Sequence, residues 1–146
     1  METYNIMILD SEASAAALRE HLQSSGFQSV DIASDPLEAL SMFRNKKYHI
    51  FLADMDLPAM GGIDILKQVK HYDPLTQVVM MTSGSTIDRA LTCLELGASD
   101  YVLKPFKDDD VVPGIVKDAV KKLERWKEAI RETVFRQNQS QNQVTE

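Results

Sequence analysis

Several features that would identify a class of protein are scarce in this sequence of 146 residues. Cys93 is the single cysteine, which excludes an intramolecular disulfide framework and favours a reducing compartment. Lys and Arg number 16 against 22 Asp and Glu, so the net charge of −6 argues against a general nucleic-acid surface. No run approaches the roughly 18 apolar residues of a membrane span, and the opening run Ile6–Leu9 is too short for a signal peptide. These absences predict a soluble, cytoplasmic protein without a direct nucleic-acid or membrane partner.

Short apolar segments alternate with helical patterns along the chain. Five segments are typical of strands buried in a parallel sheet, at residues 4–9, 27–33, 48–53, 78–81 and 101–103. Helices are expected at residues 13–25, 63–71 and 87–96, with another that begins at Pro36 and a last one that begins at residue 109 or 110. This alternation predicts an α/β fold, a doubly wound five-stranded parallel sheet with helices on both faces and the flavodoxin-like order 2-1-3-4-5.

The last predicted helix is longer than a single domain requires. Its apolar positions continue at a helical spacing through Trp126 and Ile130. We expect the domain to span residues 1–124 and the helix to extend beyond it over residues 125–136. The Gln-, Asn- and Ser-rich residues 137–146 are expected to form a polar disordered tail. The extension would be a docking helix or a short coiled coil, or only a frayed end.

Polar residues with useful chemistry follow four of the predicted strands: Asp10, Asp54, Thr82 and Lys104. Because the carboxyl ends of parallel strands share one edge of a sheet, these side chains are expected to meet. Two carboxylates suit Mg²⁺, which takes few protein ligands and keeps several waters. A hydroxyl and an ammonium beside them would complete a cradle for a phosphoryl group. Any one of these residues could be an ordinary turn or capping residue, but four of complementary types at one edge predict a site.

Four sequence segments give the chain a family resemblance. They are Ile6-Met-Ile-Leu-Asp10, Ala53-Asp54-Met-Asp-Leu-Pro58 with Gly62, Met81-Thr82-Ser83, and Gly97-Ala-Ser-Asp-Tyr101-Val-Leu-Lys104-Pro105-Phe106. In this order and spacing the chain resembles the receiver domain of two-component response regulators, the CheY-like superfamily, over roughly residues 3–124. The last segment, with its Lys-Pro-Phe, is the most specific of the four.

The resemblance implies a phosphoprotein of two-component signal transduction rather than an ordinary enzyme. Asp54 would be the phospho-acceptor, taking a phosphoryl group from a histidine kinase or a phosphotransfer protein. Asp10 would hold Mg²⁺, with Asp54 and the main-chain carbonyl of Asp56 as further ligands. Thr82 and Lys104 would bind the phosphoryl oxygens. Such a domain assists its own phosphorylation and dephosphorylation.

The resemblance also implies a switch that presents an altered surface to a partner. The loop after Thr82 would shift toward the phosphoryl group, and Tyr101 would change rotamer with it. The altered surface would be the face formed by residues 86–124. A downstream protein, or a second copy of the chain in a homodimer, would bind there or on the helix of residues 123–136.

One departure from the family pattern concerns the metal site. Receivers normally carry two adjacent acids after the first strand, and Ser11 stands in the place of the second. Mg²⁺ affinity should therefore fall, although Ser11 could contribute a neutral oxygen or hold a metal-bound water. We hypothesise that the Asp56 side chain restores part of the lost negative charge and helps to bind the metal. The alternative is that Asp56 is merely solvated.

Two other classes of function stay open at this point. Ser11 favours a pseudo-receiver, a phosphorylation-independent interaction module that has kept the fold, but the four retained strand-end residues weigh against it. A phosphatase or phosphotransferase of a related doubly wound fold would also place a second acid two residues after its nucleophile, as Asp56 follows Asp54. In those enzymes, however, the nucleophile follows the first strand, whereas here the pair follows the third.

Overall fold

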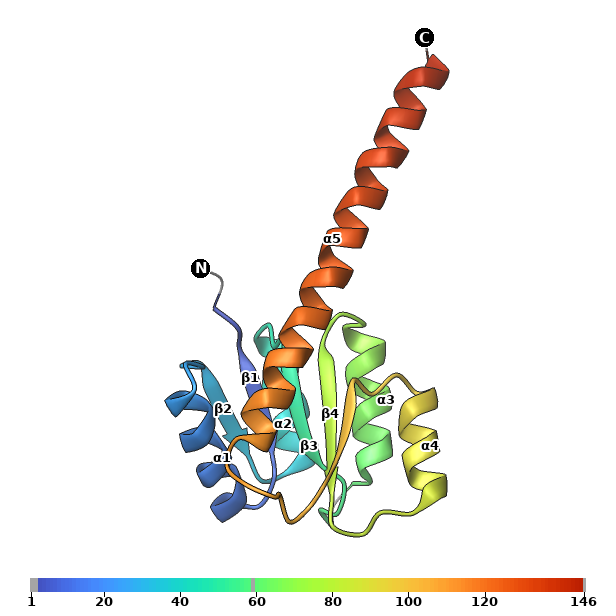
Figure 1. Cartoon of the computed structure of the whole chain (residues 1–146). Coiled ribbons are helices and arrows are strands. Elements are labelled where there is room, and N and C mark those ends of the chain that lie inside the picture. Colours follow the sequence, from blue (N-terminus) through green and yellow to red (C-terminus); the bar gives the residue numbers. More distant parts are fainter. Residues whose placement is uncertain (1–2, 59, 146) are drawn as a thin grey trace.

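Strands and helices alternate through the described chain (Figure 1). The computed structural model describes residues 3–58 and 60–145, with side chains through residue 141. Its elements are β1 (Ile6–Leu9), α1 (Glu12–Ser24), β2 (Val30–Ala33), α2 (Pro36–Asn45), β3 (Ile50–Asp54), α3 (Gly62–Tyr72), β4 (Gln77–Thr82), α4 (Ile87–Glu95), β5 (Asp100–Leu103) and α5 (Val111–Thr145). Each predicted strand and helix is present, and most ends differ from the prediction by a few residues, as is usual for frayed ends.

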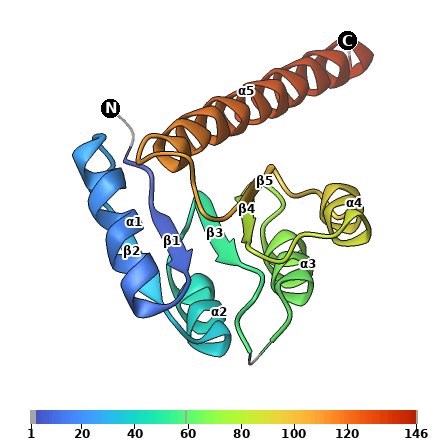
Figure 2. The same cartoon turned by 60° about the horizontal axis from the view of Figure 1, so that its bottom comes forward.

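The strands form one parallel sheet in the order β2-β1-β3-β4-β5, which confirms the predicted topology. Figure 2 shows α1 and α5 on one face of the sheet and α2, α3 and α4 on the other. The register pairs Leu9 with Ala53 and Asp54 with Met81, so β1, β3 and β4 end at about the same level. The residue that follows each strand therefore emerges at the same edge of the sheet.

The central strand β3 is buried on both faces. Phe51 and Ala53 belong to the core under α2 and α3, and Ile50 and Leu52 belong to the core under α1 and α5. All four have no exposed surface, which explains why this segment is apolar without alternation in the sequence. Asp54 is the last residue of β3 and lies at the edge of the sheet, so burial of the strand on both faces fixes where its carboxylate emerges.

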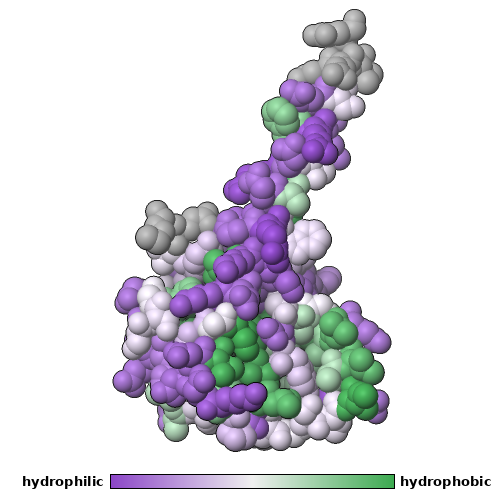
Figure 3. Space-filling view, viewed as in Figure 1, coloured by the Kyte–Doolittle hydropathy of each residue, from purple (hydrophilic) through white to green (hydrophobic). Residues whose placement is uncertain are grey.

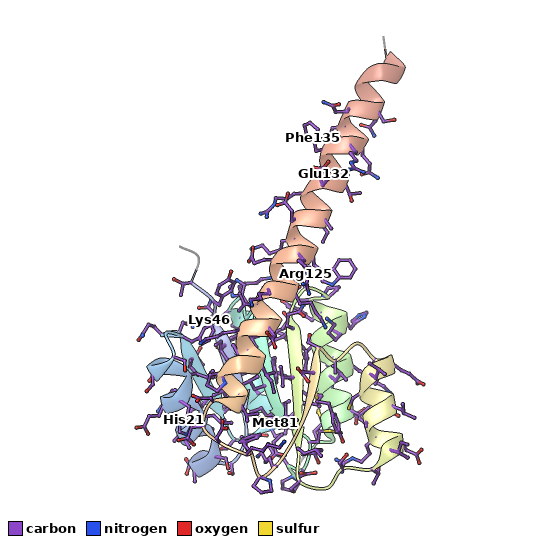
Figure 4. All side chains as sticks on the ribbon, in the orientation of Figure 1. His21, Lys46, Met81, Arg125, Glu132 and Phe135 are labelled. Carbon is purple, nitrogen blue, oxygen red and sulfur yellow. The ribbon has the colours of Figure 1, made fainter. Side chains whose placement is uncertain are left out.

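The last helix extends well beyond the sheet on which it packs. Ala119 and Leu123 of α5 are buried, whereas Trp126 is 57% exposed. Figure 4 shows Glu132 and Phe135 on the part of α5 that projects away from the sheet. The apolar stripe of this helix therefore leaves the core of the domain after Leu123.

The helix continues to Thr145, so the prediction of a disordered tail over residues 137–146 is wrong as far as residue 145. Residues 137–145 have no apolar stripe with which to pack on the sheet, but they can still continue the helix that precedes them. After Gly114 the chain has no Gly or Pro that would end the helix, and an ion pair of 3.0 Å joins Arg136 to Glu132 one turn away. In the described part of the chain, no helix is both long and apolar enough to cross a bilayer.

A buried tyrosine ties the start of β3 to β2. The Tyr48 hydroxyl donates a hydrogen bond of 2.5 Å to Asp31 Oδ2, and Lys46 Nζ lies 2.9 Å from the same oxygen. Burial by itself would raise the pKa of Asp31, but the hydrogen bond from Tyr48 and the charge of Lys46 outweigh it and lower that pKa. A lowered pKa in the folded state means that ionised Asp31 stabilises the fold above its unfolded pKa. This contribution is lost as the pH falls through the folded-state pKa.

Replacing the Tyr48 hydroxyl tests this contact. Tyr48→Phe should lower the free energy of unfolding at pH 7 by about 1–2 kcal/mol, the range for a hydrogen bond to a partly exposed charged group. In urea unfolding the loss should shrink at about pH 3, where Asp31 becomes protonated in the variant. Tyr72→Phe is a matched control, because Tyr72 is 58% exposed and its hydroxyl donates only to the Arg44 carbonyl at 3.3 Å. An equal loss at both pH values would contradict the role given to the Asp31 charge.

Candidate functional site

Three charged side chains meet at the carboxyl ends of β1, β3 and β5. Lys104 Nζ lies 2.7 Å from Asp10 Oδ2 and 3.5 Å from Asp54 Oδ2. Asp54 Oδ1 accepts a hydrogen bond of 2.9 Å from the main-chain N–H of Asp56. The Asp10 side chain is only 1% exposed, against 11% for Asp54 and 18% for Lys104. The three charged residues predicted at the strand ends therefore come together, and solvent reaches Asp54 and Lys104 but hardly reaches Asp10.

Burial of the Asp10 carboxyl group disfavours its ionised form. Burial raises its pKa, and the neighbouring Asp54 carboxyl adds to that rise, while the charge and hydrogen bond of Lys104 oppose it. The main-chain N–H of Ser11 also donates to Asp10 Oδ1 at 2.7 Å. On balance the pKa of Asp10 is raised, so its ionised form weakens the fold at neutral pH. A cation bound beside the two carboxylates would relieve this cost.

The carboxylates at this edge fit the ligand chemistry of Mg²⁺. This ion commonly takes one or two carboxylates from a protein and keeps several waters, and Asp10 and Asp54 supply two. Among the residues that the structure describes, no three His, Cys, Asp or Glu side chains converge on one metal position. The Asp56 carboxylate, hypothesised to join the pair, is held elsewhere, and Ser11 touches the pair through its main-chain N–H.

Asp56 faces the end of β4 and the start of α4. Thr82 Oγ1, which is buried, donates to the Asp56 carboxylate, with both oxygens at 3.1 Å. The Ser83 N–H and Oγ donate to Oδ2 at 2.9 and 3.2 Å, and Arg89 Nη2 lies 3.3 Å from Oδ1. Burial would raise the pKa of Asp56, but these bonds outweigh it and lower that pKa. The Asp56 carboxylate is thus ionised at neutral pH, and it is neither paired with Asp10 nor merely solvated.

Arg89 is a residue of this site that sequence analysis did not single out. It lies in the first turn of α4, where its main-chain N–H donates to the capping hydroxyl of Thr86 at 3.2 Å. Its guanidinium turns back over the loop, and Nη1 donates to the Gly84 carbonyl at 2.5 Å. An arginine at the start of an exposed helix looks like an ordinary surface residue in the sequence. Its acidic partner is 33 positions away, so only the fold reveals the pair.

Tyr101, the predicted switch residue, lies beside the charged cluster rather than within it. This residue is half-buried on β5, and its hydroxyl is 2.9 Å from Ser85 Oγ. Ser85 belongs to the same loop after β4 as Ser83. The main-chain N–H of Lys104 donates to the Thr82 carbonyl at 2.8 Å, which joins the ends of β5 and β4. Tyr101 is therefore linked to the loop that holds Asp56.

A close contact at the start of α3 positions the loop that carries Asp54 and Asp56. A Cβ atom on Gly62 would lie 2.7 Å from Met55 Cα, which is closer than real side chains approach. On the other side, the Met55 N–H donates to the Met81 carbonyl at 2.8 Å. The loop is held between β4 and α3, and only glycine allows this spacing.

The chain is similar to known proteins over most of its length. A family model described as the response regulator receiver domain matches residues 6–116. Sporulation initiation phosphotransferase F of Bacillus subtilis (strain 168) is 33% identical over 123 residues, which are 84% of this chain and 94% of that protein. The transcriptional regulatory protein ZraR of Klebsiella oxytoca is 32% identical over 108 residues, which are 74% of this chain and 24% of that protein. The transcriptional regulatory protein YkoG of Bacillus subtilis (strain 168) is 33% identical over 116 residues, which are 79% of this chain and 50% of that protein. The chain thus spans a quarter to a half of these two regulators.

Solved structures share the fold. A structure described as the BeF3-activated DrrB receiver domain has a TM-score of 0.73 at 26% identity, covering 83% of this chain and 99% of that one. A CheY-like response regulator receiver domain protein from Methanospirillum hungatei JF-1 has a TM-score of 0.79 at 23% identity, covering 85% and 98%. At that identity the second likeness speaks for the fold alone.

The contact at Gly62 can be tested by adding one methyl group. Gly62→Ala should lower the free energy of unfolding by about 1–3 kcal/mol, the usual cost of an overpacked position, because the loop with Asp54 must shift. Gly61→Ala is the matched control, since its Cβ would meet nothing closer than an Asp64 oxygen at 3.8 Å. Chemical denaturation of both variants measures the difference. Equal stabilities would show that the contact with Met55 does not restrict the loop.

The raised pKa of Asp10 predicts a pH dependence opposite in sign to that of Asp31, whose pKa is lowered. An acid whose pKa is raised by folding stabilises the fold below its unfolded pKa and loses that contribution as the pH rises through the folded-state pKa. Asp10→Asn should therefore raise the free energy of unfolding at pH 7 without divalent cations. The gain should vanish near pH 3, where Asp10 is itself protonated. Asp118→Asn, an exposed acid on α5, is the control for net charge. A loss of stability at pH 7 would mean that the ion pair with Lys104 outweighs burial.

Proposed function

This chain belongs to the family of response regulator receiver domains, and on that premise we propose that Asp54 accepts a phosphoryl group from a phosphohistidine. The donor would be a histidine kinase or a phosphotransfer protein. The observation that supports Asp54 is its carboxylate at the end of β3, partly open to solvent and 3.5 Å from the Lys104 ammonium. A bond forms between an Asp54 oxygen and phosphorus while the phosphorus–nitrogen bond breaks. The imidazole nitrogen leaves with the electron pair.

Balancing negative charge is the main task of the residues around Asp54. When bound by Asp10 and Asp54, Mg²⁺ would supply positive charge to the phosphoryl oxygens. The main-chain carbonyl of Asp56 is the third proposed ligand, since its side chain is engaged with β4 and α4. Lys104 would turn from Asp10 toward a phosphoryl oxygen, and Thr82 would donate its hydroxyl to another. Each of these residues acts without giving up a proton to the transferred group.

The surface that changes with phosphorylation is proposed to lie over residues 86–124. Ile87, Leu91 and Leu94 of α4 are 76%, 50% and 69% exposed, and Figure 3 shows apolar surface over this helix. The hydrogen bond between Tyr101 and the loop after β4 would carry a shift of that loop to this face. A downstream protein partner with an apolar surface would bind here.

The projecting part of α5 is a second proposed contact surface. Trp126, Ile130 and Val134 are spaced by four residues, and they are 57%, 45% and 50% exposed. Such a stripe is typical of a helix that packs on another helix. It would serve a partner or a second copy of the chain. This use agrees with the proposed division into a domain over residues 1–124 and an extension after it.

A phosphorylation-independent interaction module is the second candidate, and two specific observations favour it. Ser11 leaves the Mg²⁺ position one acid short of the family pattern. In addition, Thr82 Oγ1, which would bind a phosphoryl oxygen, already donates to Asp56. A module of this kind would present the same α4 and α5 surfaces without a change in covalent state.

Phosphorylation by a small donor separates the two candidates. Incubation with acetyl phosphate and Mg²⁺ should add one phosphoryl group to the intact protein, as measured by mass spectrometry. The adduct should be absent without Mg²⁺ and in Asp54→Asn, because both the metal and the acceptor oxygen are required. An adduct in Asp54→Asn would assign the acceptor to another residue. No adduct in the folded wild-type protein, even in rapid-quench samples, would favour the phosphorylation-independent module.

A further inference from the structure

The Asp56 carboxylate accepts more hydrogen bonds than a partly exposed aspartate requires. Its two oxygens receive hydrogen bonds from Thr82 Oγ1, from the Ser83 N–H and Oγ, and from the Arg89 guanidinium. The Asp56 side chain is nevertheless 31% exposed, and water could solvate it without any of these bonds. A hydroxyl, a main-chain N–H and a guanidinium around one anion are the donor types that bind a phosphoryl group.

Two of these donors, Thr82 and Ser83, directly follow Met81, the residue that pairs with the proposed acceptor Asp54 in the sheet. Asp56 follows Asp54 by two positions, and its main-chain N–H donates to Asp54 Oδ1 at 2.9 Å. Thr82 is the residue proposed to donate to a phosphoryl oxygen, but its hydroxyl is occupied by Asp56 at 3.1 Å. A phosphoryl group on Asp54 would therefore compete with the Asp56 carboxylate for the Thr82 hydroxyl.

We infer that the Asp56 carboxylate stands in for the phosphoryl group in the unphosphorylated protein, and that Arg89 is a further phosphoryl-binding residue of this chain. This inference rests on the proposed function. On phosphorylation of Asp54, the phosphoryl oxygens take over the Thr82 and Ser83 donors, and the Asp56 carboxylate moves into solvent. Arg89 keeps an anionic partner throughout and passes from the carboxylate to the phosphoryl group.

Charge and geometry favour this exchange. A phosphoryl group carries about −1.5 to −2 charges, against −1 for a carboxylate, so it binds the same donors more strongly. The two anions repel each other, and Asp56 lies on an exposed loop that lets it leave. The hydrogen bond from Arg89 Nη1 to the Gly84 carbonyl keeps the guanidinium over the loop during the exchange. Planar guanidinium groups bind phosphate oxygens in pairs, so Arg89 suits the second anion at least as well as the first.

The exchange has a consequence for the proposed output face. Arg89 lies in the first turn of α4, the helix that exposes Ile87 and Leu91. In the exchange, Arg89 releases the Asp56 carboxylate and binds a phosphoryl group on Asp54. The contact that holds the start of α4 therefore changes with the state of Asp54. The state of Asp54 is thereby passed to α4 through a single side chain, in addition to the hydrogen bond between Ser85 and Tyr101.

Binding of beryllofluoride, a tetrahedral stand-in for the phosphoryl group, tests the inference at saturating Mg²⁺. Asp56→Ala removes the competing carboxylate and keeps the main-chain carbonyl, so it should bind beryllofluoride about fivefold or more tighter than the wild type. Asp88→Asn is the matched control. Asp88 directly precedes Arg89 in the sequence and carries the same charge as Asp56, but it makes none of the hydrogen bonds described for Asp56. The affinity of this variant should match that of the wild type. Equal or weaker binding by Asp56→Ala would overturn the inference.

A second substitution separates the two roles of Arg89. In the Asp56→Ala background, Arg89→Gln should weaken beryllofluoride binding about tenfold, because a charged donor to the bound anion is lost. If Arg89 served only to hold Asp56, Arg89→Gln would have no effect in that background and would tighten binding in the wild type. In ¹H–¹⁵N spectra, beryllofluoride should also shift the Arg89 side-chain resonances of the wild type. Unchanged resonances would overturn the role of Arg89.

The binding results distinguish a failure of the proposed function from a failure of the exchange alone. Without any anion, Asp56→Ala should shift the Ser83 amide resonance, and Asp88→Asn should leave it in place; this arm tests the Asp56 contact alone. If neither the wild type nor Asp56→Ala binds beryllofluoride, then Asp54 is not a phospho-acceptor, and both the proposed function and the exchange are overturned. If both bind it equally, the proposed function stands and only the exchange fails.

Discussion

Burial of charge at one edge of a parallel sheet is the constraint on which the rest of this site depends. Asp10 is almost fully buried, so its carboxylate needs a cation, and Lys104 supplies one at 2.7 Å. In the strand order β2-β1-β3-β4-β5, Lys104 has to reach from β5 across two strands to the end of β1. Its long side chain passes Asp54 on the way, at 3.5 Å. The same ion pair therefore offsets part of the cost of burying the acid and places an ammonium beside the proposed acceptor.

The site has two halves with different electrostatic roles. Asp10, Asp54 and Lys104 form a half with two carboxylates and one ammonium, in which burial, and to a smaller extent the Asp54 carboxyl, raises the pKa of Asp10. Thr82, Ser83 and Arg89 form a half that is rich in donors, and Asp56 satisfies them. A phosphoryl group on Asp54, together with a cation, would supply what each half lacks: positive charge for the first and a stronger anion for the second. This complementarity is the physical basis for treating the two halves as one functional unit.

The long C-terminal helix shows how packing and helix formation can be separated. Up to Leu123 the helix is held by burial against the sheet, and beyond it Trp126 stays largely exposed. The helix nevertheless continues to Thr145, because no residue in that stretch interrupts it. The polar composition of the tail predicts disorder, because it reports how little surface the segment can bury. It does not report whether the chain can continue an existing helix, and none of the tail residues is a Gly or Pro that would end it. The apolar positions of the extension remain available for a partner.

The sequence by itself determined the fold and the place of the polar residues that end the strands, because both depend on patterns that are local in the chain. Buried strands are recognisable as short apolar runs, and the polar residues at their carboxyl ends come to one edge of a parallel sheet, where Asp10, Asp54 and Lys104 meet. The tertiary structure alone decided the direction of the Asp56 side chain and brought in Arg89. A carboxylate on a loop can turn toward either half of the site, and the donors at the end of β4 and the start of α4, which lie 26 to 33 positions further along the chain, settle which way it turns.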